Sequence, residues 1–281
     1  MPRLPALPLS LAACLLICLS GVQAETSLPS SPEWTLVWSD EFTGRQGTPP
    51  NPKFWNHDVG NRDTGGWGNR ELQFYTASPR NARLDGQGHL EIRAETAQAK
   101  LPCWNDQPCR YTSARLTTKG KVEFVHGKIE ARIQVPAGQG LWPAFWSLGP
   151  GEWPDGGEID IMEWVGHTPN LVYGTVHGPG YSDALGISRE TDLGHPASGN
   201  YHTYTLIKRP DEIVWLLDGR PYQRVTPANL PAGTRWVFEQ PFSLLLNLAV
   251  GGTWPGTPPA TTVFPSSMLV DYVRIWREAG K

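Results

Sequence analysis

The segment HGKIEARIQV, residues 126–135, alternates apolar and polar side chains without a break. The apolar positions are Ile129, Ala131, Ile133 and Val135. Because successive side chains of a β-strand point to opposite faces, this pattern predicts a strand with one buried face. A helix would need apolar residues at spacings of three and four, and no window sustains such a stripe over three turns. The pattern therefore points to an all-β protein.

Many other short segments have the composition of strands bounded by turn residues. They are WTLVWSDEF (34–42), LEIRAE (90–95), NLVYGTVHG (170–178), YHTYTLIKR (201–209), EIVWLLDGRPY (212–222), FSLLLNLAV (242–250) and MLVDYVRIW (268–276). The 30 Gly and 27 Pro residues, about a fifth of the 281, divide the chain into such pieces. At this length the pattern predicts a two-sheet sandwich or jelly roll rather than a small barrel. No linker or repeat interrupts residues 34–279, so we expect one domain there.

The N-terminal segment is typical of a secretory signal peptide. A basic MPR is followed by the apolar run LPALPLSLAACLLICLSG and by VQA, which places small residues before a cleavage site. We therefore expect residues 1–24 to be removed after Ala24. Residues 25–33 would then form a short flexible leader, and the protein would be secreted or periplasmic.

Two other readings of this segment are less favoured. A membrane anchor needs about 20 uninterrupted apolar residues, and Pro5 and Pro8 shorten this run. The sequence LAAC, which ends at Cys14, resembles the lipobox of a lipoprotein. However, the residues after Cys14 stay apolar, whereas an anchored protein usually continues with polar residues. After cleavage, no membrane association is expected.

The charge balance is mildly acidic, with 27 acidic and 24 basic residues. No block of Lys or Arg appears, so neither nucleic acid nor an anionic membrane is an expected partner. Signal cleavage would leave two cysteines, Cys103 and Cys109, in the loop-like LPCWNDQPCR. In an oxidising compartment we expect them to form a local disulfide. Zinc would need more ligands than this stretch offers.

Several of the 13 tryptophans lie beside Gly and Pro rather than inside apolar runs. They are Trp67, Trp142, Trp146, Trp153 and Trp254. A Trp at a loop or strand end can stack its flat apolar face on a sugar ring. Their number in a β-sandwich indicates a carbohydrate ligand.

The segment GEIDIMEWVG contains three acids in an irregular spacing. Glu158 and Asp160 share one face of a strand, while strict alternation would place Glu163 on the other. The adjacent apolar residues Ile161 and Met162 indicate a β-bulge, which would return Glu163 to the face of the other two acids. Cα atoms four strand positions apart are about 13 Å apart in an extended strand. The sheet must therefore be concave for the carboxyls of Glu158 and Glu163 to cooperate.

Three carboxylates on one face of a strand point to acid–base chemistry. Crowding raises the pKa of at least one of them, and retaining glycoside hydrolysis needs one ionised and one protonated carboxyl about 5–5.5 Å apart. We assign Glu158 as nucleophile, Glu163 as acid/base and Asp160 as the group that hydrogen-bonds Glu158. A solvent-exposed acidic strand or a hard-cation site fits this spacing less well.

The same segment resembles the bulged active-site signature of glycoside hydrolase family 16, in the form found in laminarinase-like endo-β-1,3-glucanases. The resemblance covers nearly all of the chain after the signal peptide. The segments that carry it are WSDEF (38–42), GWGNRELQFYT (66–76), YTSARLTTKGK (111–121), HGKIEARIQVPAGQGLWPAFWSLG (126–149), GTVHG (174–178), LLLNLAVGGTWPG (244–256) and LVDYVRIW (269–276).

The resemblance implies a concanavalin A-like jelly roll with a concave cleft, and secreted, retaining endo-hydrolysis of β-1,3-glucan by a monomer that needs no cofactor for catalysis. It assigns the catalytic roles to Glu158, Asp160 and Glu163 in the same way. The positions expected to contact sugars are Asn69, Arg115, Trp142, Trp146, His177 and Trp254.

Several relatives also carry a structural calcium ion on the convex face. The corresponding ligands here are the backbone carbonyls of Glu41 and Gly88 and the carboxylate of Asp271. Such oxygen ligands suit a hard cation. The chain departs from the family pattern at Arg70, where relatives usually have Asn, which places a cation near one end of the expected cleft.

Related activities remain as alternatives. Family members also cut mixed-linkage glucan or galactans, and some are glucan-recognition proteins without activity. Mixed-linkage specialists tend to lack the bulge, and enzymes for sulfated galactans carry more basic residues. Recognition proteins commonly lack the catalytic Glu residues, both of which are present here.

Overall fold

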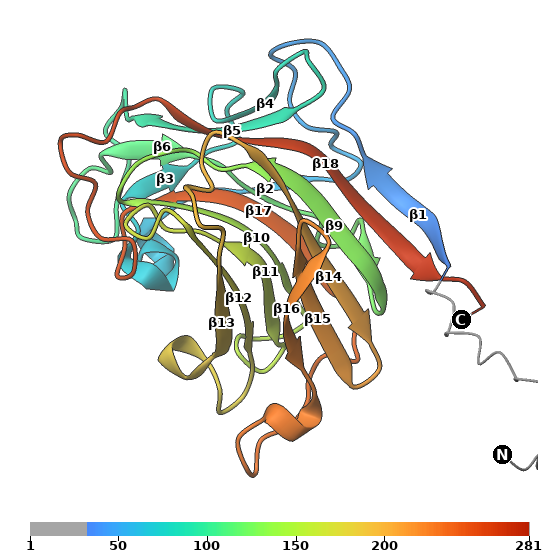
Figure 1. Cartoon of the computed structure of the whole chain (residues 1–281). Helices are drawn as coiled ribbons and strands as arrows, with labels where there is room; N and C mark the ends of the chain where they lie inside the picture. The colour runs from blue at the N-terminus through green and yellow to red at the C-terminus, as the bar shows by residue number, and fades with distance from the viewer. Residues whose placement is uncertain (1–32, 281) are drawn as a thin grey trace, which may run out of the picture. The chain divides into compact units, whose positions relative to one another are not determined.

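Eighteen β-strands in two sheets make up most of the computed structural model, which describes residues 33–280 (Figure 1). One sheet has ten strands, with the order β16-β15-β14-β9-β18-β5-β6-β3, while β1 pairs with β18 and β4 with β5. Its strands are β1 (Trp34–Asp40), β3 (Gln73–Tyr75), β4 (Ala82–Leu84), β5 (Leu90–Thr96), β6 (Tyr111–Ser113), β9 (Gly127–Gln134), β14 (Tyr201–Arg209), β15 (Glu212–Leu217), β16 (Arg220–Val225) and β18 (Ser266–Glu278).

The second sheet has eight strands, with the order β13-β12-β11-β10-β17-β7-β2, while β8 pairs with β17. Its strands are β2 (Asn56–Asp58), β7 (Arg115–Thr117), β8 (Glu123–Phe124), β10 (Leu141–Leu148), β11 (Glu158–Glu163), β12 (Leu171–His177), β13 (Ile187–Asp192) and β17 (Phe242–Val250). The pairings within this sheet are antiparallel. The short helical segments are η1 (Arg62–Thr64), η2 (Gly66–Arg70), η3 (Asp183–Leu185) and η4 (Pro227–Asn229).

The two sheets stack over a single hydrophobic core. Ile129 and Ile133 of β9 pack in one cluster with Phe145 of β10 and Leu246 of β17. Burial alternates strictly along β9, as its sequence predicted, because one face meets the other sheet and one face meets solvent. β17 is buried at all nine positions, and it is an inner strand of its sheet, between β10 and β7. Figure 1 shows the sheets strongly curved, and the predicted jelly-roll sandwich is confirmed.

The segment EIVWLLDGRPY forms a hairpin that turns at Asp218–Gly219. β15 and β16 flank this turn, and both turn residues have positive φ angles of 49° and 75°. Such angles match a primed two-residue turn. The predicted signal peptide and all but Glu33 of the leader fall outside the described residues. Within residues 33–280 no helix is long and apolar enough to cross a membrane.

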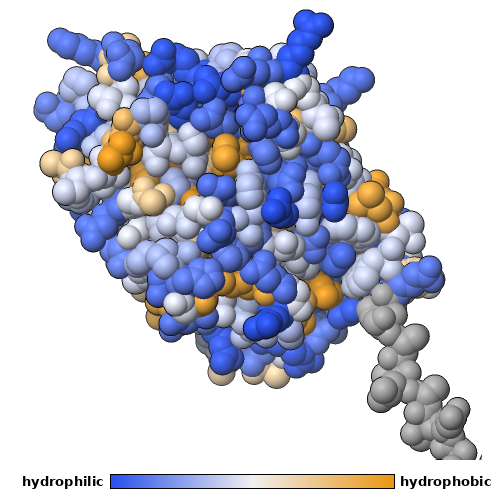
Figure 2. Space-filling model, turned by 45° about the horizontal axis from the view of Figure 1, so that its top comes forward, coloured by the Kyte–Doolittle hydropathy of each residue, from blue (hydrophilic) through white to orange (hydrophobic). Residues whose placement is uncertain are grey.

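Exposed apolar side chains are scattered over the surface. The large ones are Leu36, Val37, Val59, Val125, Trp153, Leu185 and Val263. Figure 2 shows a face that is mainly hydrophilic with small separate apolar spots. Isolated apolar residues of this kind are normal on protein surfaces. Of these side chains, Trp153 differs in that it helps to line a cleft.

Candidate active site

The bulge predicted in the acidic strand is present in β11. Opposite β10, Phe145 pairs with Met162 and Trp146 pairs with Asp160, so Ile161 has no partner. The register with β12 shifts at the same place, between Asp160 and Glu163. The bulge therefore returns Glu163 to the face that carries the other two acids, and all three acids line one cleft.

Two tryptophans from neighbouring loops and strands hold the outer acids. The indole N–H of Trp142 donates to Glu163 Oε1 at 3.1 Å. The indole N–H of Trp153 donates to Glu158 Oε2 at 2.5 Å. Each of these Glu side chains is therefore fixed by a donor that lies on the wall of the cleft.

Asp160 lies between them and is the most buried of the three, with 2% of its surface exposed. His177 of β12 faces it, with Nε2 3.2 Å from Asp160 Oδ2. Beneath the strand, Trp215 donates its indole N–H to the backbone carbonyl of Asp160 at 2.8 Å. This contact anchors the middle of the bulged strand to the ten-stranded sheet.

Burial and mutual repulsion set the protonation of these groups. Burial, together with the charge of Glu158, raises the pKa of Glu163 to about 8. Burial and the charge of Asp160 also raise the pKa of Glu158 well above its usual value. Burial opposes a charge on His177, but its hydrogen bond to Asp160 and the nearby carboxylates outweigh this and raise its pKa to about 9. At neutral pH the site therefore holds a protonated Glu163 and an imidazolium beside Asp160.

The cleft has a volume of about 880 Å³ and runs across the eight-stranded sheet. It brings together every side chain that the sequence assigned to catalysis or sugar contact. These are Asn69, Arg115, Trp142, Trp146, Glu158, Asp160, Glu163, His177 and Trp254. They come from the four strands β7, β10, β11 and β12, from the turn η2 and from the loop after β17, which the curved sheet gathers along one surface.

Four of the five tryptophans that line the cleft form two groups. Trp254 meets Trp142 edge to face with ring centroids 5.3 Å apart, and Tyr173 packs on its other side at 5.0 Å. At the other group, the Arg115 guanidinium lies 4.4 Å from the Trp67 ring and 4.7 Å from the Trp146 ring. Such rings and stacked planes are surfaces on which sugar rings bind.

The sequence analysis missed two polar residues on the floor of the cleft. Asn247 accepts the indole N–H of Trp146 at 2.7 Å and donates to the Tyr75 hydroxyl at 3.1 Å. Glu71 is 4% exposed, and burial raises its pKa to about 7 although Gln73 donates to it at 2.5 Å. A polar residue inside the apolar run FSLLLNLAV was a usable signal for Asn247.

Trp67 and Trp153 also line the cleft. The sequence singled them out as tryptophans that could stack on a sugar ring, although the family resemblance did not include them among the sugar-contacting positions. Arg70, in contrast, does not belong to the residues that line the cleft. Its guanidinium lies 5.8 Å from the ring centroid of Trp104, in the disulfide loop.

The predicted disulfide is confirmed, because Cys103 and Cys109 are bonded. Among the described residues, Glu158, Asp160 and His177 are the group of acidic, His and Cys side chains close enough to hold a metal ion, with ligand atoms within 4.8 Å of one another. An imidazolium has no free lone pair for a metal. The raised pKa of His177 therefore favours an ion pair with Asp160 over metal ligation at neutral pH.

Comparisons with known proteins agree with this geometry. The family model described as glycosyl hydrolases family 16 matches residues 71–274. The chain is 42% identical over 261 residues to the beta-glucanase of Rhodothermus marinus, covering 88% of this chain and 86% of that protein.

Solved structures give the same result. The endo-beta-1,3-glucanase of Pyrococcus furiosus superimposes with a TM-score of 0.82 at 45% identity, covering 88% of this chain and 96% of that one. A mutant of SCLam, a non-specific endo-beta-1,3(4)-glucanase with an oligosaccharide at its active site, superimposes with a TM-score of 0.77 at 34% identity, covering 90% and 97%. The chain belongs to glycosyl hydrolase family 16 and is a glycoside hydrolase.

Proposed function

We propose that this glycoside hydrolase is a retaining endo-β-1,3-glucanase that cuts laminarin-type glucan. The observation that carries the proposal is the bulge at Ile161, which places Glu158, Asp160 and Glu163 on one side of an aromatic cleft. The relatives described as a glucan endo-1,3-beta-glucosidase and as an endo-beta-1,3-glucanase support the choice of substrate. The cleft runs across the eight-stranded sheet. A cleft of this form, in contrast to a closed pocket that accepts only the end of a polysaccharide, favours cutting within the polymer.

In this proposal Glu163 is the acid of the first step. A pKa of about 8 keeps its proton at neutral pH, so it can protonate the glycosidic oxygen as the bond breaks. The Glu158 carboxylate attacks the anomeric carbon and forms the glycosyl–enzyme ester. Glu163, now ionised, then takes a proton from the water that hydrolyses this ester.

Asp160 controls the charge on the nucleophile. It is hydrogen-bonded to Glu158, so one proton is shared between the two carboxyls. When that proton sits on Asp160, Glu158 is ionised and ready to attack. The N–H of Trp153 also stabilises the ionised form of Glu158, because it donates to Oε2.

The test is a chromatographic product profile of laminarin incubated with the protein that begins at Glu25. Short oligosaccharides of several lengths should appear early. Product release from laminarin should also exceed that from agarose or carrageenan. A lack of products from laminarin, with products from a galactan, would overturn the β-1,3-glucan assignment.

We also propose a structural calcium ion held by the carbonyls of Glu41 and Gly88 and by Asp271. Asp271 lies at a bulge, because the register between β18 and β9 shifts between Val270 and Tyr272. One of its carboxylate oxygens accepts from Arg132 at 2.6 Å. Two carbonyls and a carboxylate form a donor set that suits this hard cation.

Export through the signal peptide with cleavage after Ala24 remains a proposal as well. The disulfide between Cys103 and Cys109 supports it, because disulfides persist in oxidising compartments. N-terminal sequencing of the protein recovered outside the cytoplasm would test the cleavage site. A mature N-terminus at Glu25 is expected, whereas one at Cys14 would indicate a lipoprotein.

A further inference from the structure

The turn that carries Trp67 and Asn69 into the cleft has an unusual backbone. Gly65, Gly66, Trp67, Gly68 and Arg70 all have left-handed φ angles, between 58° and 78°. Glycine adopts this conformation freely, but for Trp67 and Arg70 it costs energy. A strained segment of this kind persists only when its surroundings hold it in place.

Trp104 packs against the back of this turn. A Cβ built on Gly66 would lie 2.6 Å from Trp104 Cδ1, so the indole and the turn are in tight contact. The Arg70 guanidinium covers the same ring at 5.8 Å. Trp104 itself is not among the residues that line the cleft, and it therefore supports the turn from behind rather than touching the ligand space.

The disulfide loop holds Trp104 in this position. Trp104 follows Cys103 directly, and the bond to Cys109 closes a ring of only a few residues around it. Its backbone N–H donates to Asn61 Oδ1 at 2.9 Å. The backbone carbonyl of Asn61 in turn accepts the N–H of Gly66 at 3.0 Å.

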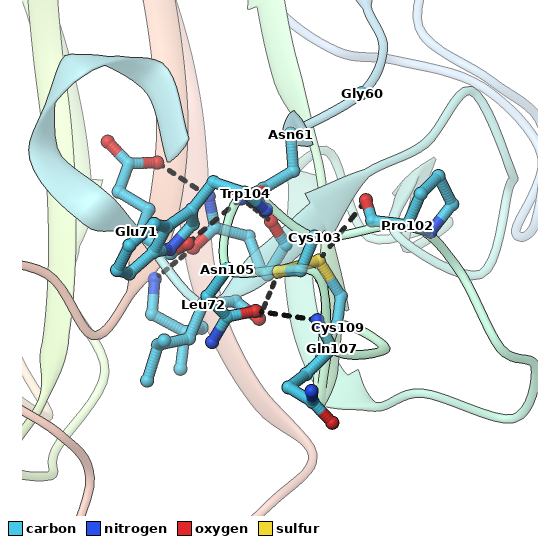
Figure 3. The surroundings of a disulfide bond; sticks show 12 residues. Gly60, Asn61, Glu71, Leu72, Pro102, Cys103, Trp104, Asn105, Gln107 and Cys109 are labelled. Atoms are coloured by element: carbon cyan, nitrogen blue, oxygen red, sulfur yellow. Dashed lines mark hydrogen bonds between the residues drawn. A yellow bond between two sulfur atoms is a disulfide. The ribbon is translucent and has the colours of Figure 1, made fainter. Parts of the chain in front are cut away.

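Figure 3 shows the disulfide, Trp104 and Asn61 together, beside Glu71 and Leu72. The buried Asn61 amide also donates to the carbonyls of Glu71 and Gln73, at 2.9 and 2.8 Å. The loop is thus connected to both ends of the strained turn.

We propose that Trp104 is a positioning residue for substrate binding, and that the disulfide loop holds it so that Trp67 and Asn69 keep their places in the cleft. The proposal rests on the glucan hydrolysis proposed above. Its consequence is that opening the disulfide weakens glucan binding at this end of the cleft while the three acids, on β11, keep their geometry. Substrate affinity would then depend on the redox state of Cys103 and Cys109.

The test compares Trp104→Ala and Trp104→Phe with Trp34→Ala. Trp34 is a matched control, because the guanidinium of Arg209 lies 5.7 Å from its ring centroid, much as that of Arg70 lies 5.8 Å from the ring centroid of Trp104. Trp34 lies on β1 of the ten-stranded sheet and is not among the residues that line the cleft. For Trp104→Ala we expect KM for laminarin to rise about tenfold with kcat within about twofold, as for a misplaced binding surface. Trp104→Phe should restore most of the affinity, and Trp34→Ala should leave KM unchanged.

The reduced wild type and the Cys103→Ser/Cys109→Ser variant should show the same rise in KM, also if Trp104→Ala fails to fold. A merely structural disulfide would lower the melting temperature of these proteins without changing KM. That result, with an active wild type, would overturn the inference.

Hydrogen exchange separates this inference from the proposed function. The amides of Gly66, Glu71 and Thr253 bond to carbonyls of this turn or of Asn61. In Trp104→Ala and in the reduced protein they should exchange about tenfold faster, since local opening controls exchange. Unchanged exchange would overturn the positioning role even if laminarin proves not to be the substrate, whereas an inactive wild type would overturn only the proposed function.

Discussion

β9 and β11 both set acidic side chains between apolar ones, but they use them differently. In β9 the alternation is unbroken, and Glu130 accepts hydrogen bonds from the hydroxyls of Thr205 and Tyr272 at 2.8 and 3.1 Å. In β11 the alternation breaks at Ile161 and Met162, and Glu158 and Glu163 face the cleft. Regular alternation builds the sandwich, whereas the break in it concentrates charge.

The neighbours of the acids explain the difference in chemistry. Glu130 meets neutral hydroxyl donors that satisfy a carboxylate in place. Glu163 is buried near another carboxylate, and this combination raises its pKa to about 8. The acids of a strand therefore become catalytic because the bulge and the neighbouring strands bury them beside other charged groups.

The largest expected effect is a difference in kcat between variants of the acids in β11 and a variant of the acid in β9. Glu158→Gln and Glu163→Gln should each lower kcat on laminarin by about a thousandfold or more, because each removes a group that acts in bond breaking. Glu130→Gln should leave kcat within about twofold, since it only replaces one hydrogen-bonding partner by another.

The control for these variants is glucan binding measured by calorimetry. Both cleft variants should still bind laminarin oligosaccharides, because the aromatic surfaces are intact. Wild-type-like turnover in either cleft variant would refute its assigned role.

Much of this contrast could be predicted from the sequence. Alternation predicted β9, the paired apolar residues predicted the bulge, and the spacing of Cys103 and Cys109 predicted their bond. These signals are local, so they survive without knowledge of the fold.

The missed contacts are long-range. The hydrogen bond from Trp146 to Asn247 joins residues 101 positions apart, and the one from Asn247 to Tyr75 joins residues 172 apart. Only the stacking order of the strands brings such groups together. Likewise, the residues next to Trp153 in the sequence do not reveal that its indole N–H donates to Glu158.

A smaller effect should come from the donor to the nucleophile. Trp153→Phe keeps an aromatic ring but removes the N–H that favours ionised Glu158. A hydrogen bond to a charged group is worth about 1.5–3 kcal/mol, so we expect kcat/KM to fall about tenfold. The acid limb of the pH–rate profile should move to higher pH, because the pKa of Glu158 rises further. An unmoved acid limb would count against this role.

The two strands should also differ in how pH affects stability. Between pH 4.5 and about 8 the Glu163 carboxyl is ionised in the unfolded chain but still protonated in the folded protein. The unfolded state then binds fewer protons, so stability falls as pH rises through this window. Glu163→Gln removes this loss and should be about 1–2 kcal/mol more stable than wild type at pH 8, with little gain at pH 4.

Chemical denaturation at the two pH values measures this difference. Glu130→Gln, whose parent residue is held by hydroxyl donors, should show no such gain at pH 8. An equal gain in both variants would mean that the cleft does not disfavour the charge on Glu163.

The smallest effect concerns the proposed calcium ion, whose ligands Glu41, Gly88 and Asp271 are not among the residues that line the cleft. EDTA should lower the melting temperature by a few degrees, about what the loss of ~1 kcal/mol produces in a domain of this size. Activity at room temperature should change little, and added calcium should restore the melting temperature. Asp271→Asn should remove the response. A melting temperature that ignores EDTA and calcium would argue against the ion.

The central claim is that Glu158, as the nucleophile, and Glu163, as the acid/base, carry out one double displacement. Proton NMR of laminarin during the first minutes of hydrolysis tests it most directly, because the anomeric signal of new reducing ends appears before mutarotation. The account predicts that the β-anomer forms first. Initial formation of the α-anomer would show inversion and would contradict the assignment of Glu158 as a nucleophile.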